Sequence, residues 1–444
     1  MEEYGIRICT VGRVRVVMSV LRAGALALTV VLALVQCSAA PMNAAPGADE
    51  TASASRFDAA TIARGAQLAA VGNCGYCHTG PGYEPYAGGL GIESSFGTVY
   101  STNITPDRDT GIGAWSLEDF TRAMREGQDR RGRPFYPAFP YDHFTLLTDD
   151  DVGALYAFAM TRPAVNARVP SNKLMFPINL RLSAAAWKFL FFKRQTFEPD
   201  ASKSAEWNRG AYLVEGLAHC GACHTPRNLM GAEKKDEAFG GGEADGWVAP
   251  ALNAASPSAF PWTAERMEAY LRTGRDDKNG VAAGPMKYVV HDLSGASEQD
   301  VRAMAVYLAS LDTRPVAERE KRGETLVAMR KQVAAERAGA EAYRGACAPC
   351  HGAARELTGT LRLSNSTSLH LDTPVNLIRI VREGITTAEW ESGPWMPAFG
   401  AALSDAQFAD LAAYLRERFS DQPPWKDVPG ELKRVARQNE RQGR

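Results

Sequence analysis

One pattern, Cys-x-x-Cys-His, constrains this chain more than any other feature, because it occurs three times in 444 residues. The three copies consist of Cys74, Cys77 and His78, of Cys220, Cys223 and His224, and of Cys347, Cys350 and His351. The composition predicts about 0.002 such matches by chance. The spacing is typical of covalently attached haem c, in which two thiols bond to one porphyrin and the adjacent imidazole ligates its iron.

Two other kinds of site use the same cysteine spacing, namely structural zinc sites and redox dithiols. A zinc tetrahedron needs a second pair of ligands, and no copy is accompanied by a second cysteine pair. Six of the eight cysteines belong to the motifs, and the other two, Cys9 and Cys37, stand near the N-terminus. We therefore predict three covalently bound haem c groups, whose proximal iron ligands are His78, His224 and His351.

The first 45 residues have the composition of a secretory signal peptide with its leader. Arginines precede an apolar run over Ala23–Val35, and small residues follow at positions 38–40. The run is too short to predict a membrane span with any force. Cys37 leaves lipoprotein processing as an alternative, although Gln36 before it fits that signal poorly. We expect export to the periplasm.

The rest of the chain repeats one plan three times. Each unit opens with a Gly-Ala pair eight to ten residues before the first motif cysteine, at Gly65, Gly210 and Gly339. Each closes with an amphipathic segment of similar text, over 151–158, 300–307 and 408–414. Caps at Thr148 and Ser404 precede the first and third of these segments. The repeat predicts a mainly α fold of three tandem cytochrome c-like haem domains, in which the porphyrin supplies much of each small core.

The predicted boundaries follow from this repeat. We expect the signal peptide and leader over 1–45, the three haem domains over 56–165, 204–313 and 336–420, a connector over 166–203, a helical linker over 314–335 and a basic tail over 421–444. The tail is expected to be solvated, with contact to a partner or to anionic lipid as the alternative.

The connector contains an unusual segment over 178–192, which is rich in Leu, Phe and Trp. Arg181 and Lys188 are seven residues apart and so share one helical face. Basic residues on one face and aromatic residues on another suit a helix that lies at a membrane surface. Packing against a neighbouring domain or a partner subunit is the equal alternative.

An electron-carrying haem iron needs a second protein ligand, which we expect between each motif and its closing helix. Met286 and Met396 occupy this position in the second and third units, each in a stretch with Pro and Gly that predicts a loop. A lone methionine is more often core filler. Here the position repeats, so we predict that Met286 and Met396 ligate the second and third irons; His291 is the alternative for the second.

The first unit departs from this pattern, because Phe139 stands where the methionine is expected. His143 follows four residues later in the same loop, and we predict that it ligates the first iron. The alternatives are Met124, Met160 or a five-coordinate iron.

Five longer segments of the sequence identify a family. These are Thr102–Asp107, Thr110–Ser116, Asn208–Gly216, His219–Asn228 and Met396–Gly400. With them the chain resembles, over roughly residues 57–420, the three-haem cytochrome c subunits of bacterial periplasmic dehydrogenases. That resemblance implies the proximal ligands and the two methionine ligands named above. It also implies a catalytic dehydrogenase subunit as partner, of molybdenum hydroxylase, quinoprotein or flavoprotein type, and an acceptor that is membrane quinone or a cytochrome oxidase.

We therefore expect an electron-transfer subunit at the outer face of the inner membrane, with substrate chemistry left to the partner. No nucleotide-binding fingerprint is present, and a net charge of −1 gives no indication of a nucleic-acid partner. Two other functions are alternatives. A haem enzyme of the di-haem peroxidase kind needs an open iron, which the first unit would supply, and a haem sensor needs a signalling domain, which the sequence does not reveal.

Overall fold

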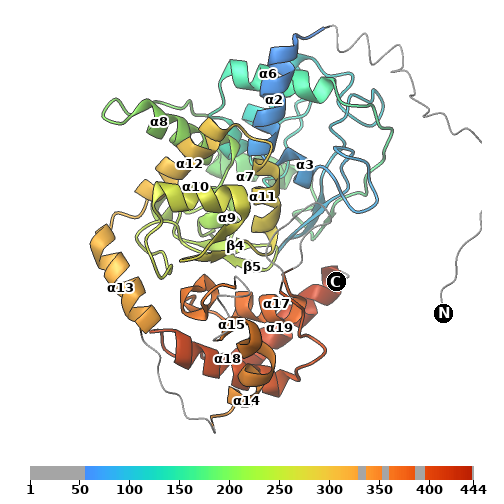
Figure 1. Cartoon of the computed structure of the whole chain (residues 1–444). Coiled ribbons are helices and arrows are strands. Elements are labelled where there is room, and N and C mark those ends of the chain that lie inside the picture. The colour runs from blue at the N-terminus through green and yellow to red at the C-terminus, as the bar shows by residue number, and fades with distance from the viewer. Residues whose placement is uncertain (1–55, 329–336, 353–359, 386–395, 443–444) are drawn as a thin grey trace, which may run out of the picture. The chain divides into compact units, whose positions relative to one another are not determined.

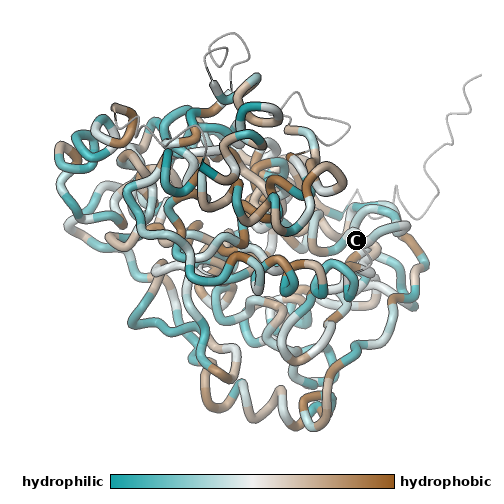
Figure 2. The backbone as a smooth tube through the Cα atoms, turned by 90° about the horizontal axis from the view of Figure 1, so that it is seen from below, coloured by the Kyte–Doolittle hydropathy of each residue, from teal (hydrophilic) through white to brown (hydrophobic). Residues whose placement is uncertain are grey.

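The computed structural model describes residues 56–328, 337–352, 360–385 and 396–442 (Figure 1). The predicted signal peptide and Cys37 lie outside these residues. The described chain is mainly helical with a few short strands, which confirms the mainly α character of the expected fold. Figure 2 shows hydrophobic and hydrophilic residues alternating along the coils, as amphipathic helices require.

The first unit and the connector hold six helices and one small antiparallel sheet of order β1-β2-β3. The helices are α2 (Ala59–Val71), α3 (Cys74–Cys77), α4 (Leu117–Glu126), α5 (Tyr141–Phe144), α6 (Asp149–Met160) and α7 (Arg181–Phe191). The strands are β1 (Gly91–Ser94), β2 (Gly97–Tyr100) and β3 (Lys173–Leu174). Strand β3 ties the start of the connector to the first unit.

The second unit repeats the opening and closing helices around two short hairpins. Its helical elements are α8 (Ala205–Tyr212), the π-helix η1 (Leu213–Leu217), α9 (Gly221–His224), η2 (Lys235–Glu237), α10 (Ala264–Thr273), α11 (Pro285–Leu293) and α12 (Glu298–Ser310). The hairpins pair β4 (Gly242–Ala244) with β5 (Trp247–Ala249) and β6 (Arg275–Asp276) with β7 (Gly280–Val281).

The linker forms α13 (Val316–Ala328), as expected, and the third unit follows. Its elements are α14 (Ala340–Ala342), the π-helix η3 (Tyr343–Cys347), α15 (Ala348–His351), η4 (Leu363–Asn365), η5 (Thr367–Leu369), α17 (Val375–Glu383), α18 (Asp405–Phe419) and α19 (Val428–Gln442).

The repeated glycine has one structural role in all three units, where the opening helix crosses the closing helix. A Cβ atom added there would lie 2.0–2.3 Å from a carbonyl oxygen of the closing helix: Ala154 O for Gly65, Ala303 O for Gly210 and Asp410 O for Gly339. Only glycine permits so close an approach of two backbones. The closing helices are capped as predicted, because Thr148 and Ser404 accept hydrogen bonds from the backbone three residues later.

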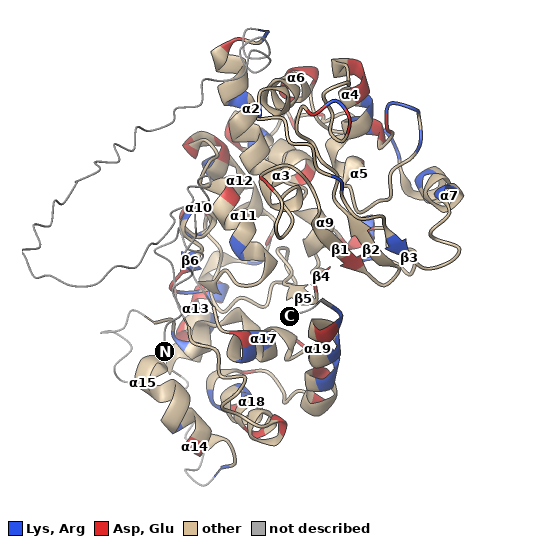
Figure 3. Cartoon of the chain, turned by 90° about the vertical axis from the view of Figure 1, so that its right-hand side faces the viewer, with Lys and Arg blue, Asp and Glu red and all other residues tan. Residues whose placement is uncertain are grey.

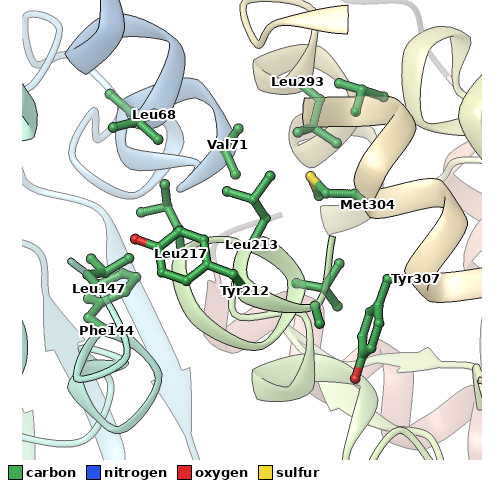
Figure 4. Packing of buried hydrophobic residues seen from close by; sticks show 14 of the residues in the cluster. Leu68, Val71, Phe144, Leu147, Tyr212, Leu213, Leu217, Leu293, Met304 and Tyr307 are labelled. Carbon is green, nitrogen blue, oxygen red and sulfur yellow. The ribbon is translucent and has the colours of Figure 1, made fainter. Parts of the chain in front are cut away.

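The first two units share one hydrophobic core. Leu68 and Val71 of α2 meet Leu213 and Leu217 of η1 and Met304 of α12 (Figure 4). The third unit has a separate core. Apolar side chains of both units are buried in one cluster, so moving the two units apart would expose them to water and cost free energy.

Two arginines and two aspartates form a square beside the shared core. Arg64 lies 3.2 Å from both Asp151 and Asp300, and Arg209 lies 3.4 Å and 2.8 Å from the same two carboxylates. Each arginine precedes the crossing glycine of its unit, and each aspartate lies in the first turn of a closing helix. The two units thus contribute equivalent residues to one ion-pair network.

The tail does not behave as predicted. Residues 428–442 form α19, whose Val428, Leu432 and Val435 are buried in the core of the third unit. The prediction of a solvated tail was therefore wrong. The prediction was based on the charge of the tail. Its apolar residues recur at helical spacing, and this pattern predicts a packed helix.

Candidate haem sites

Each Cys-x-x-Cys-His motif occupies a short helical turn. The motifs coincide with α3, α9 and α15, and a π-helix precedes the second and third. A helical turn brings residues three apart to the same face, which is what attachment of both thiols to one porphyrin requires. π-Helical turns occur frequently at functional sites.

The three motif histidines are oriented in the same way. Nδ1 lies 2.6 Å from Thr102 O in His78, 2.7 Å from Pro250 O in His224 and 3.0 Å from Leu361 O in His351. A carbonyl oxygen only accepts, so each Nδ1 carries the proton and Nε2 keeps its lone pair. A backbone carbonyl behind the ring is the usual arrangement for a metal-ligating histidine. The residues present therefore fit a proximal iron ligand at all three places.

The protonation states agree with this role. Burial lowers the pKa of His78, His224 and His351, so all three rings are neutral, as ligation requires. Burial also raises the pKa of Cys74 and Cys220 to about 12, so these side chains lie among groups that do not favour a thiolate. A reactive or zinc-binding thiolate pair calls for the opposite environment.

Equivalent elements precede Met286 and Met396 in the second and third units. In the second and third units, the helix before the methionine ends at a glycine with positive φ, namely Gly274 (φ 70°) and Gly384 (φ 76°), and an antiparallel pairing follows. Met396 takes part in that pairing, with its N 2.9 Å from Ile385 O. The placement of Met286 was predicted wrongly in one detail, because Met286 lies in the first turn of α11 and not in a loop. Proline at a first helical position favours a helix start there.

The first unit repeats the glycine-ended helix with α4 and Gly127, yet no methionine follows before its closing helix. Phe139 packs between Phe135 and Phe144. His143 Nδ1 lies 2.6 Å from Glu215 O, and its Nε2 lies 2.8 Å from Glu233 Oε1. Both of these partners belong to the second unit, so ligation of the first iron by His143 stays a prediction that requires Nε2 to leave Glu233.

The pair of His143 and Glu233 also borders the second motif. A Cβ atom on Gly221 would lie 3.1 Å from Cε1 of His143. Burial opposes both charges, but the hydrogen bond outweighs it, so the pKa of His143 is raised and that of Glu233 is lowered. The sequence could have indicated this site only through the unexplained histidine, since Glu233 lies 90 residues away.

Several other side chains that could ligate iron are buried or hydrogen-bonded within the fold. Met124 and Met160 are buried in hydrophobic clusters. His370 is buried with Nε2 2.9 Å from Ser364 O, and Nδ1 of His219 lies 3.0 Å from Leu217 O. His291 lies in α11 with Met286.

The first motif also touches the second unit. Tyr76 stacks on Tyr288 of α11 with ring centroids 4.4 Å apart, and the backbone N–H of Tyr76 donates to Asp292 at 3.4 Å. The helix that carries Met286 thus meets the first haem motif. Sequence reasoning missed this contact, because nothing in the motif text relates residues more than 200 positions apart.

Comparisons with known proteins identify the family. The cytochrome c subunit of alcohol dehydrogenase (quinone) from Gluconobacter oxydans is 36% identical over 83% of this chain and 80% of its own length. The gluconate 2-dehydrogenase cytochrome c subunit of Pantoea cypripedii is 35% identical over 80% of this chain and 85% of its own. The chain belongs to the cytochrome c subunits of dehydrogenases. As a c-type cytochrome it binds haem covalently.

Two further matches add detail to this membership. A nicotinate dehydrogenase polypeptide of Pseudomonas putida is 46% identical over 85% of this cytochrome c subunit, which spans only 32% of that longer relative. A family model described as cytochrome C oxidase, cbb3-type, subunit III matches residues 334–415, which cover most of the third unit.

Proposed function

We propose that this chain carries three haem c groups and passes electrons from a dehydrogenase catalytic subunit to a membrane acceptor. The observation that carries the proposal is the threefold recurrence of Cys-x-x-Cys-His with a neutral histidine held from behind by a backbone carbonyl. Haem c supplies reversible one-electron chemistry when bound. The chain fixes the spacing and the axial ligands.

The proposed roles follow residue by residue. The pairs Cys74 and Cys77, Cys220 and Cys223, and Cys347 and Cys350 attach the porphyrins, and His78, His224 and His351 are the proximal ligands. Met286 and Met396 are the proposed second ligands of the second and third irons, and His143 that of the first. The haem domains are proposed to span 56–165, 204–313 and 336–420.

The partner and the location are part of the same proposal. Relatives are named as subunits of alcohol, gluconate, fructose and nicotinate dehydrogenases, which supports a catalytic dehydrogenase subunit as partner. We favour a molybdenum hydroxylase over a quinoprotein or a flavoprotein, with quinone or a cytochrome oxidase as acceptor. The complex would work in the periplasm at the outer face of the inner membrane. The relatives' names support electron transfer over the peroxidase alternative.

Mass spectrometry of the exported chain tests the proposal. We expect the mass of the polypeptide plus three haems, and a dehydrogenase catalytic subunit that copurifies with it. Replacement of either cysteine of one motif by alanine is expected to weaken attachment of that haem alone. A wild-type mass with fewer than three haem increments would contradict the proposal.

The first iron has its own test. We expect His143→Ala to change the absorption and electron paramagnetic resonance spectra of one low-spin haem out of three. Glu233→Gln is the matched variant, because it keeps the imidazole and removes only the carboxylate at 2.8 Å. If His143→Ala leaves all three haem spectra unchanged, His143 is not a ligand.

A further inference from the structure

Helix α7 separates two kinds of surface. Ala184 and Trp187 point inward, where the indole N–H of Trp187 donates to Met230 O at 3.0 Å. Arg181 donates to Pro134 O and Lys188 to Glu126 O, so both basic residues fasten the helix to the first unit. The packing alternative from the sequence therefore holds for this inner face but does not account for the outer one.

The outer face is strongly apolar and open to solvent. Leu182 and Phe189 are seven residues apart, share this face and are 76% and 88% exposed. Of the ten large hydrophobic side chains exposed in the described part of the chain, eight lie on α7 or on the two segments joined to it. They are Met175, Phe176, Leu180, Leu182, Phe189, Leu190, Leu229 and Met230. We call these eight residues the α7 face.

Hydrogen bonds and close contacts connect the three segments of the α7 face. Trp187 bonds to Met230 O, and the N–H of Met175 donates to Phe96 O at 3.0 Å. A Cβ atom on Gly231 would lie 3.2 Å from the ring of Phe96, so the loop around 229–231 lies beside the β1–β2 turn. Concentration of exposed apolar side chains in one place marks a surface that meets something less polar than water.

The charges within the connector part of the α7 face have one sign. Residues 173–194 include five Lys or Arg and no Asp or Glu. Figure 3 shows Lys and Arg on α7 and at β3. Lys173 and Lys193 are exposed near the two ends of this stretch. Glu126 of the first unit pairs with Arg194 at 3.0 Å. A connector that carries basic residues and no acidic ones within an exposed apolar face is complementary to a bilayer interface, where anionic phosphates lie just outside the hydrocarbon.

The length and attachment of α7 favour lying on a membrane over crossing one. It has 11 residues and is fastened along its inner face, so Leu182, Phe189 and Leu190 project outward from the fold. In the described residues, no helix combines the length and hydrophobicity needed to span a bilayer.

We propose that the α7 face docks the chain onto an anionic phospholipid surface, with Leu182 and Phe189 inserted at the interface and Lys173 and Lys193 beside the phosphates. The inference deepens the proposed function and rests on it for the location of the membrane. It assigns membrane contact to a folded surface of this chain, formed by the connector and the loop around Leu229.

Vesicle binding tests this assignment with the mature, haem-loaded chain. We expect it to sediment with vesicles of phosphatidylcholine and phosphatidylglycerol at about 3:1, and less with phosphatidylcholine alone. The double variant Leu182→Ser with Phe189→Ser should bind about tenfold more weakly, because two exposed side chains no longer bury apolar area. Leu117→Ser is the matched control, since Leu117 is 45% exposed but lies on α4, outside the α7 face, and should bind as the wild type does.

A second variant tests the charges. Lys173→Gln with Lys193→Gln should bind the phosphatidylglycerol vesicles about tenfold more weakly and leave the weak binding to phosphatidylcholine unchanged. Unaltered binding of the Leu182/Phe189 variant, or no wild-type binding, would overturn the assignment. So would loss of the catalytic subunit from that variant with vesicle binding intact, which would assign the face to a protein partner. Haem mass and reduction by ascorbate, measured in the same samples, report separately on the proposed function.

Discussion

The first two units and the third follow one plan, yet they are joined to their neighbours in different ways. Units one and two share a hydrophobic core and the square of Arg64, Arg209, Asp151 and Asp300. The third unit keeps its own core, against which Val248 of the second unit packs, and it also meets the second unit through hydrogen bonds, among them Arg379 to Gly246 O. The difference indicates one cooperative pair and one attached unit.

This difference has a consequence for electron transfer. A shared core fixes the distance between two haem motifs, because separating them would expose apolar side chains to water. Polar contacts between two units stabilise their relative position by a smaller free energy than a shared core does, since water can replace these contacts.

The largest expected effect tests whether the first two units unfold together. Gly65→Ala would place Cβ 2.0 Å from Ala154 O, so α2 and α6 must separate. We expect a loss of about 3 kcal/mol in unfolding free energy, and the first two units should unfold together because they share a core. Thermal unfolding followed by circular dichroism and by the haem absorption bands measures this. Gly153→Ala is the control, since its Cβ meets nothing within 4 Å; equal stability of the two variants would contradict the close crossing.

From the sequence, this helix crossing could be recognised only as a repeated glycine. The repeated Gly65, Gly210 and Gly339 marked three equivalent places, but periodicity does not say which backbone lies opposite. The haem motifs, the closing helices and their caps were predicted because each depends on residues close together in the chain. The acceptors behind the motif histidines were not predicted, since any residue offers a carbonyl oxygen and only the fold selects Thr102 or Pro250.

Long-range pairs escaped prediction for a related reason. His143 was singled out by its position, while its partner Glu233 belongs to another unit. The tail was assigned from its charge, although Val428, Leu432 and Val435 recur at helical spacing and are buried. In both places a local signal was present, and the missing information was which surface of the fold would face it.

The second effect tests the attachment of the third unit. Arg379 is fully buried and donates to Gly246 O, Glu383, Asn439 and Gln438. We expect Arg379→Met to cost about 2 kcal/mol, because buried acceptors lose their donor. Only the third unit should unfold at a lower temperature. Arg437→Met, an exposed change on α19 next to the Arg379 partner Gln438, should have no effect. A joint shift of all three units would show that the third is not separately attached.

A smaller effect compares an aspartate in the first turn of a closing helix of the pair with one in the first turn of the closing helix of the third unit. Asp300→Asn removes the charge that meets Arg209 at 2.8 Å and Arg64 at 3.2 Å. We expect a loss of about 1.5 kcal/mol, reduced from that of a fully buried pair because Arg64 is partly exposed. Asp405→Asn, in the first turn of α18, removes an exposed partner of Arg382 and should cost less than about 0.5 kcal/mol. Urea unfolding measures the loss of unfolding free energy in both variants. Equal losses would show that the square does not stabilise the pair more than an exposed ion pair stabilises the third unit.

The smallest effect concerns pH. Burial alone would raise the pKa of Asp300, but its bonds to Arg209 and Arg64 outweigh burial and lower it. The folded pKa is therefore below the unfolded one, so the square stabilises the pair fully above about pH 4 and loses this contribution as the pH falls further. We expect the stability difference between wild type and Asp300→Asn to be constant from about pH 7 to pH 5 and to shrink below about pH 4. Thermal unfolding over this range, at constant ionic strength, measures it. A difference that grew on acidification would mean that Asp300 binds its proton more tightly in the folded chain, and the square would then destabilise the pair it closes.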